Sequence, residues 1–247
     1  MFGLLLDIYD ASVRNLPHLK FNKDNEHNRT LVSLYATIIE MTNSAIILRK
    51  SGVFTGVDVI LRTTLEAHVD LINLANDATY MNSMRAVYHK EWIRVTEEGL
   101  KGENQFLAFF KNNVDAEEQL AHHKSELAKC LATSKMLTNF EKFKMAGMEE
   151  IYRSIYNSLC NESHNNIRAL NDRHFRQKAE GAEIVIFDQP TKIDLAATLD
   201  CFIATLLLSC EILHHYFKSD EKIQNEFKSF RAYKDEKGHE WTGDLGL

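Results

Sequence analysis

The sequence contains few of the residues that interrupt helices. Its 247 residues include only two prolines, Pro17 and Pro190, and ten glycines. Proline lacks a backbone N–H donor and clashes with the preceding turn, so a long helix requires a stretch without it. The scarcity of both residues disfavours a sandwich of short strands. It predicts an all-α protein folded as a single multi-helix bundle.

The cysteines and the apolar runs are also sparse. The chain has four cysteines and no CxxC pair, which predicts reduced thiols rather than a disulfide framework. The N-terminal MFGLLLDIYDAS has no basic leader, and no uncharged run reaches the roughly 18 residues that cross a bilayer. We therefore expect a cytoplasmic protein without membrane contact.

The charge balance is acidic. Lys and Arg number 29 against 35 Asp and Glu, which gives a formal net charge of −6. Such a chain is not a general nucleic-acid binder, because it lacks the overall positive field that attracts phosphates. Binding to RNA would then depend on a local basic cluster.

The hydrophobic periodicity divides the chain into helices and one extended segment. We predict one helical domain over residues 1–232, a short extended segment near 183–190, and a loosely ordered C-terminal tail over 233–247. The helices are expected at about 2–15, 27–51, 54–76, 80–113, 115–134, 148–171, 192–217 and 219–232.

The helix expected over 54–76 carries a single line of charge. Asp58, Arg62, Glu66 and Asp70 follow one another at intervals of four residues, which places them on one helix face. One interpretation is a stripe of exposed ion pairs, each worth about 0.3–0.5 kcal/mol. The other is that Arg62 and Glu66 point into a cleft, where buried charges must be paired.

The helix expected over 148–171 carries a second polar line. Its members are chemically mixed: Arg153, Asn157, Cys160, Asn161, His164 and Arg168. An imidazole can act as general acid or base near neutral pH, and an arginine can bind a phosphate through its planar fork. The alternative is that His164 is structural and bonds a backbone carbonyl or Glu66.

Metal and cofactor motifs are incomplete. Glu211 and His214 form an ExxH, but a di-iron bundle needs a second ExxH and two further glutamates. Adding Glu66 and His68 gives the wrong spacing for that motif. The sequence has no Walker loop, GxGxxG or GxSxG. We therefore expect no metal and no cofactor.

Two short segments resemble a known family. Leu61-Arg62-Thr-Thr-Leu65-Glu66 resembles the R-x-x-x-E helix of a bacterial all-helical family of unknown function. The segment from Tyr156 to His164 resembles that family's Y-x-x-L-S-x-x-x-H signature, with Cys160 in the place of serine. The resemblance covers roughly residues 30–217. The helical layout is also similar to the HEPN superfamily of R-x4–6-H ribonucleases, found in toxin–antitoxin and antiphage systems.

This resemblance implies a function and roles for the two polar lines. It implies a metal-independent ribonuclease or nucleotide-processing effector, acting as a homodimer on RNA or a nucleotide, with a cognate protein as a further partner. The catalytic residues would be His164, Glu66 and Arg62. The substrate-binding residues would be Arg168, Arg153, Asn161, Asn157 and Tyr156.

A non-catalytic function is the alternative. The chain would then be a helical module that binds a partner protein or a small ligand, and Arg62, Glu66 and His164 would form a structural network. Both hypotheses require that Glu66 and His164 converge on one part of the bundle.

Overall fold

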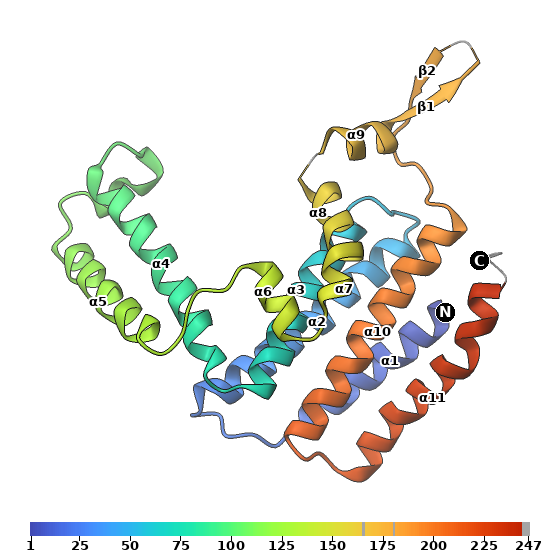
Figure 1. Cartoon of the computed structure of the whole chain (residues 1–247), viewed down its shortest axis with the longest axis horizontal. Coiled ribbons are helices and arrows are strands. Elements are labelled where there is room, and N and C mark those ends of the chain that lie inside the picture. The colour runs from blue at the N-terminus through green and yellow to red at the C-terminus, as the bar shows by residue number, and fades with distance from the viewer. Residues whose placement is uncertain (165, 180, 244–247) are drawn as a thin grey trace. The chain divides into compact units, whose positions relative to one another are not determined.

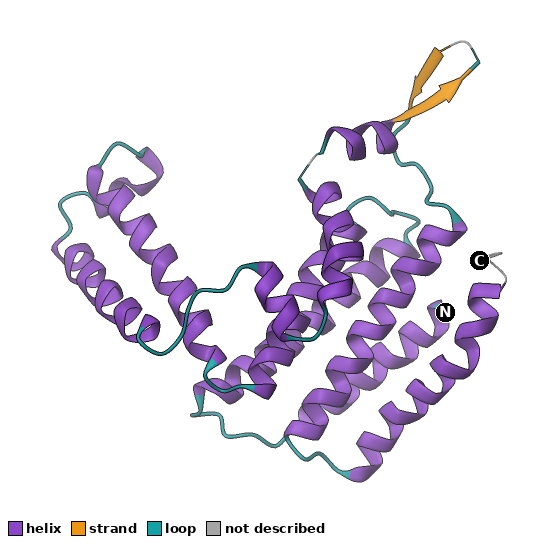
Figure 2. Cartoon of the chain, viewed as in Figure 1, coloured by secondary structure: helices purple, strands orange, loops and turns teal. Residues whose placement is uncertain are grey.

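The computed structural model describes residues 1–164, 166–179 and 181–243. Those residues are mostly helical, and the only sheet among them is a two-stranded antiparallel hairpin, which confirms the predicted all-α class (Figure 2). The long helices are α1 (Phe2–Asn15), α2 (Glu26–Lys50), α3 (Val57–Asn76), α4 (Tyr80–Lys101), α5 (Val114–Leu131), α10 (Lys192–Tyr216) and α11 (Glu221–Gly243). The shorter elements are η1 (Leu16–His18), η2 (Gln105–Phe110), α6 (Asn139–Met145), α7 (Glu149–Ile151), η3 (Tyr152–Tyr156), α8 (Asn157–Ser163), α9 (Ile167–His174), β1 (Phe175–Lys178) and β2 (Gly181–Ile184).

The helices fall into two compact units. The first unit comprises residues 1–75 and 143–247, and the second comprises residues 76–142. Within each unit, the helices pack against one another. The expected single domain over residues 1–232 stays a prediction.

The core of the first unit forms around α10. This helix packs against α1, α2 and α11, which run beside it in Figure 1. Phe202, Ile203 and Leu206 of α10 are buried, and the Tyr35 hydroxyl of α2 donates to Cys210 Sγ at 3.2 Å. Burying apolar area against several neighbours stabilises a helix that has little polar surface of its own.

Two of these core helices are also long and apolar. By length and composition alone, α2 and α10 could each cross a membrane. Core helices of globular proteins pass the same test, and 39% and 44% of their apolar windows are buried inside the structure. The cytoplasmic location stays a prediction.

The second unit is a hairpin of α4 and α5. The predicted helix over 80–113 is wrong in its length, because α4 ends at Lys101 and Gly102 follows in the left-handed conformation (φ +72°). The chain then forms the 3₁₀ segment η2, which returns Phe110 onto α4. A Cβ on Gly99 would lie 2.5 Å from Phe110 Cδ2, so glycine is needed for this close approach.

The predicted helix over 148–171 is interrupted. It begins with α7, widens into the π-helical turn η3, and continues as α8 to Ser163. Residue 165 lies outside the described residues, and α9 begins a separate helix at Ile167 with Asn166 as its N-cap. The π turn shifts the helical register, so angles computed from an ideal α-helix do not apply across it.

The extended segment and the C-terminus also differ from the expected bounds. β2 pairs with β1 in a register that sets Phe175 opposite Ile184, so the hairpin begins earlier than residue 183. Helix α11 continues to Gly243, past the expected end at 232. Residues 244–247 of the predicted loose tail lie outside the described residues.

Candidate functional site

The charged line on α3 lies partly buried rather than free in solvent. Arg62 Nε lies 3.2 Å from Glu66 Oε1, one helical turn away, and the two side chains are 21% and 37% exposed. Arg62 Nε is itself buried and makes no hydrogen bond to the described residues. The contact is therefore an ion pair without an aligned hydrogen bond, and other groups must complete the arrangement.

Tyr156 connects this pair to the π-helical turn. Its hydroxyl donates to Glu66 Oε1 at 2.5 Å, and the Arg62 guanidinium lies 5.6 Å from the centre of its ring. The ring is buried between Phe143 and Tyr152, with centroid distances of 4.6 and 5.2 Å. This aromatic cluster holds Tyr156 in place, so the arginine and glutamate of α3 have a rigid support.

The ionisation of Tyr156 and Arg62 agrees with this geometry. Burial raises the pKa of Tyr156, and its hydrogen bond to Glu66 raises it further. The phenol therefore keeps its proton and acts as a donor at neutral pH. The hydrogen bond with Tyr156 raises the pKa of Arg62, which keeps the guanidinium charged.

His164 completes the group from the end of α8. Arg62 Nη1 lies 2.9 Å from His164 Nε2, and the histidine is exposed to solvent. A guanidinium can only donate, so Nε2 must accept. The imidazole in this arrangement is consequently neutral, with its proton assigned to Nδ1. Arg62 thus joins the glutamate of one helix to the histidine of another, as both hypotheses required.

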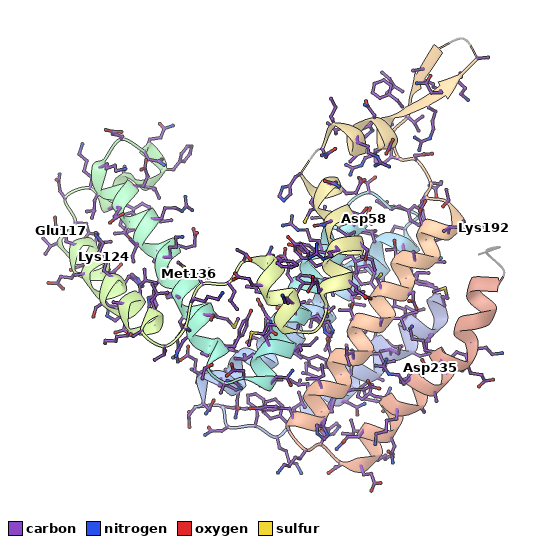
Figure 3. The ribbon with its side chains drawn as sticks, viewed as in Figure 1. Asp58, Glu117, Lys124, Met136, Lys192 and Asp235 are labelled. Atoms are coloured by element: carbon purple, nitrogen blue, oxygen red, sulfur yellow. The ribbon has the colours of Figure 1, made fainter. Side chains whose placement is uncertain are left out.

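A second charged group lies at the start of α3 (Figure 3). The pKa of Asp58, which is labelled there, is raised from its ordinary value. Burial and the charge of Glu162 raise it, and the charge of Arg173 opposes them. Arg173 Nη2 donates to Glu162 Oε2 at 2.6 Å and to the Glu162 carbonyl at 3.1 Å. Asp58 belonged to the predicted line, but no sequence pattern identified Arg173, because the break before α9 brings it back onto α8.

The remaining predicted substrate-binding residues make contacts within their own helical segments or are exposed. Arg153 pairs with Glu149 of its own helical segment at 2.8 Å, and Arg168 lies 3.5 Å from Asp172 with its side chain 88% exposed. Asn157 Nδ2 donates to the Arg153 carbonyl at 3.4 Å, and Asn161 is exposed. Of the predicted residues, Arg62, Glu66, Tyr156 and His164 are joined by the ion pair and the hydrogen bonds of this group.

The residues of the incomplete metal motif have other partners. His68 Nδ1 lies 2.7 Å from Ser209 Oγ, and Glu211 Oε1 accepts from Arg231 Nε at 3.1 Å. Among the described residues, no group of three or more His, Cys, Asp or Glu side chains could hold a metal ion.

The comparisons with known proteins place the chain in a family. A family of unknown function (DUF5677) matches residues 28–182, which is more than half of the chain. The chain therefore belongs to that all-helical family, and the matched range contains Arg62, Glu66, Tyr156 and His164. Neither the curated proteins nor the solved structures gave a match.

Proposed function

We propose that this chain is a metal-independent ribonuclease or nucleotide-processing effector, with Arg62 and His164 as its catalytic residues and Glu66 as a residue that positions Arg62. The observation that carries the proposal is the 2.9 Å contact between an anchored guanidinium and an exposed imidazole. The resemblance to HEPN ribonucleases supports it. From the same resemblance, we propose that the chain is a cytoplasmic homodimer that acts in a bacterial toxin or antiphage system.

The chemistry follows from the donors and acceptors of the group. A phosphodiester oxygen would take up the Arg62 donor that now meets His164, since a phosphate is the stronger acceptor. His164 Nε2, freed in this way, would accept the proton of a ribose 2′-hydroxyl. The 2′-oxygen would attack phosphorus and expel the 5′-oxygen, which takes a proton from water. The product would be a 2′,3′-cyclic phosphate.

Glu66 and Tyr156 have positioning roles in this scheme. Glu66 pairs with Arg62, and Tyr156 donates to Glu66 and lies beside the guanidinium. They would hold the arginine at the phosphate without touching the reacting atoms. Correct placement of a charged donor before the reaction removes the cost of reorganising it at the transition state.

A substitution at His164 tests the proposal. We expect purified His164→Ala to lose at least about 100-fold in cleavage of a fluorophore-labelled RNA, the range for loss of a general base. The melting temperature should stay nearly unchanged, because the side chain is exposed. His18→Ala, at another exposed histidine of the same unit, is the matched control. Cleavage that survives in His164→Ala, or that EDTA abolishes, would contradict the assignment.

A non-catalytic binding module is the second candidate, and one observation favours it. Glu66 pairs with Arg62 and accepts a hydrogen bond from Tyr156, as the members of a structural network do. In that case Arg62→Ala should cost several kcal/mol of stability, because a half-buried carboxylate loses its counter-charge. A thermal melt of Arg62→Ala beside His164→Ala, with no RNA cleavage by the wild type, would support this candidate.

A further inference from the structure

The second unit contains two histidines that face each other across its helical hairpin. His89 comes from α4 and His123 from α5, and these two helices pack along one another (Figure 1). His89 Nδ1 lies 2.9 Å from His123 Nδ1, and the two ring centroids are 5.2 Å apart. The pair lies within residues 76–142 and shares no residue with the Arg62–His164 group.

Aromatic side chains surround the two rings. Trp92 lies parallel to the His123 ring, with a centroid distance of 5.8 Å and an interplanar angle of 6°. Tyr88 contacts both histidines edge-on, with centroid distances of 5.1 Å to His89 and 5.8 Å to His123. These contacts restrict the rotation of the rings, which places both Nδ1 atoms close together in advance. His89 is 9% exposed and His123 is half-buried, so a solute reaches the pair from the His123 side.

The contact between the two nitrogens holds a proton. One Nδ1 must donate it and the other must accept it, because two unprotonated ring nitrogens cannot bond each other. Burial is the main cause that lowers the pKa of both histidines, so both rings are neutral at neutral pH. Neutral imidazole is the form that binds metal ions, through the lone pair of its unprotonated nitrogen.

The distance between the two nitrogens fits a shared metal ion. Imidazole nitrogens bind first-row transition metals at about 2.1 Å, so two of them at a right angle around one ion lie about 3.0 Å apart. At the tetrahedral angle that Zn²⁺ prefers, they lie about 3.4 Å apart. The observed 2.9 Å therefore favours an ion with right-angled coordination, such as Ni²⁺ or Cu²⁺.

The protein supplies two ligands at this point. Among the described residues, no third His, Cys, Asp or Glu side chain converges with the pair. His122 is the neighbour of His123 in sequence, but successive residues point about 100° apart on a helix. Glu126 lies one turn further along α5, and its Oε1 accepts from Lys129 Nζ at 2.5 Å. Water would therefore occupy the remaining positions around an ion.

We propose that His89 and His123 together bind one divalent transition-metal ion of the nickel and copper class, which joins α4 to α5. The proton between the two rings would move to Nε2 of the ring that now donates it, and each ring would turn slightly to aim its Nδ1 lone pair at the ion. This site is independent of the proposed nuclease function. Removing the ion with EDTA should leave RNA cleavage unchanged.

Ni²⁺ is the probe that tests the proposal, because Cu²⁺ would oxidise the free cysteines. Isothermal titration calorimetry on the full chain, purified without a histidine tag, should show one Ni²⁺ per chain, bound more tightly than Zn²⁺. Mg²⁺ prefers oxygen ligands and should not bind. Ni²⁺ should also raise the melting temperature, because only the folded hairpin brings the two histidines together.

Three substitutions locate the ligands. His89→Gln and His123→Gln should each weaken Ni²⁺ binding at least about tenfold, since the remaining imidazole loses its chelating partner. His122→Gln, at the exposed histidine beside His123, is the matched control and should change nothing. Far-UV circular dichroism checks that each variant stays helical, and His123→Gln carries the test if His89→Gln unfolds. The proposal is overturned by a wild type that does not bind Ni²⁺, by an equal loss in His122→Gln, by binding that survives His123→Gln, or by tighter binding of Zn²⁺ than of Ni²⁺.

Discussion

Two histidines of the first unit show how burial separates a core residue from a candidate catalytic one. His68 is 1% exposed and bonds Ser209 of α10, and burial lowers its pKa to about 4. His164 is exposed and meets Arg62 of the same helix that carries His68. His68 lies two residues after Glu66, so it points about 200° around α3 from the glutamate. Position on the helix, rather than residue type, decides which imidazole a solute can reach.

The largest expected effect is a difference in stability between variants at these two histidines. His68→Ala should lower the free energy of unfolding by about 2–4 kcal/mol, because it leaves a cavity and removes a buried hydrogen bond. His164→Ala should change it by less than about 0.5 kcal/mol, as exposed positions do. Urea unfolding measures both values. Equal losses in the two variants would break the comparison.

The pH dependence of stability sharpens the same contrast. The folded-state pKa of His68 is about 4, below the ordinary value of 6.5, so the unfolded chain binds a proton that the native chain does not. Stability therefore falls as the pH drops from about 6.5 toward 4, and this histidine contributes a slope of about 1.4 kcal/mol per pH unit. Burial also lowers the pKa of His214 to about 4, so His214 contributes a pH dependence of stability with the same sign.

The variant His68→Ala measures how much of this pH dependence of stability comes from His68. The slope of unfolding free energy between pH 4.5 and 6 should be shallower by about 1.4 kcal/mol per pH unit in His68→Ala than in the wild type. His164→Ala serves as the comparison. A slope in His68→Ala equal to that of the wild type would mean that the buried imidazole is not the titrating group.

The long helices could be predicted from sequence because their signals are local. The apolar pattern and scarce breakers fixed α2 and α10 to within a residue, and Asn25 and Thr191 cap them through their side chains. The end of α4 was missed although Gly102 marks it, because Phe106 to Phe110 continue the apolar pattern. The packing of Phe110 on Gly99 decides that region, and such a contact is not a local signal.

The candidate site was only partly predictable for a similar reason. The four-residue spacing of Arg62 and Glu66 is enough to place them together. It does not show which side chains of another helix meet them. The π-helical turn changes the register between Arg153 and His164, so Arg153 pairs with Glu149 and Tyr156 faces Glu66 instead.

The smallest expected effect concerns that tyrosine. Tyr156→Phe keeps the ring between Phe143 and Tyr152 but removes the donor to Glu66, so we expect a loss of about 1 kcal/mol in the free energy of unfolding. Tyr88→Phe, at an exposed tyrosine of the second unit, should cost almost nothing and serves as the control.

The same substitution distinguishes a positioning residue from a structural one. If Tyr156 positions Arg62 through Glu66, then Tyr156→Phe should reduce the rate of RNA cleavage. The double variant Tyr156→Phe with Glu66→Gln should then lose less of that rate than the product of the losses in the two single variants. Coupling in stability without coupling in activity would instead assign the hydroxyl to the packing of α3 against the π turn. The catalytic role of His164 would then depend on its contact with Arg62 and not on the Tyr156 hydroxyl.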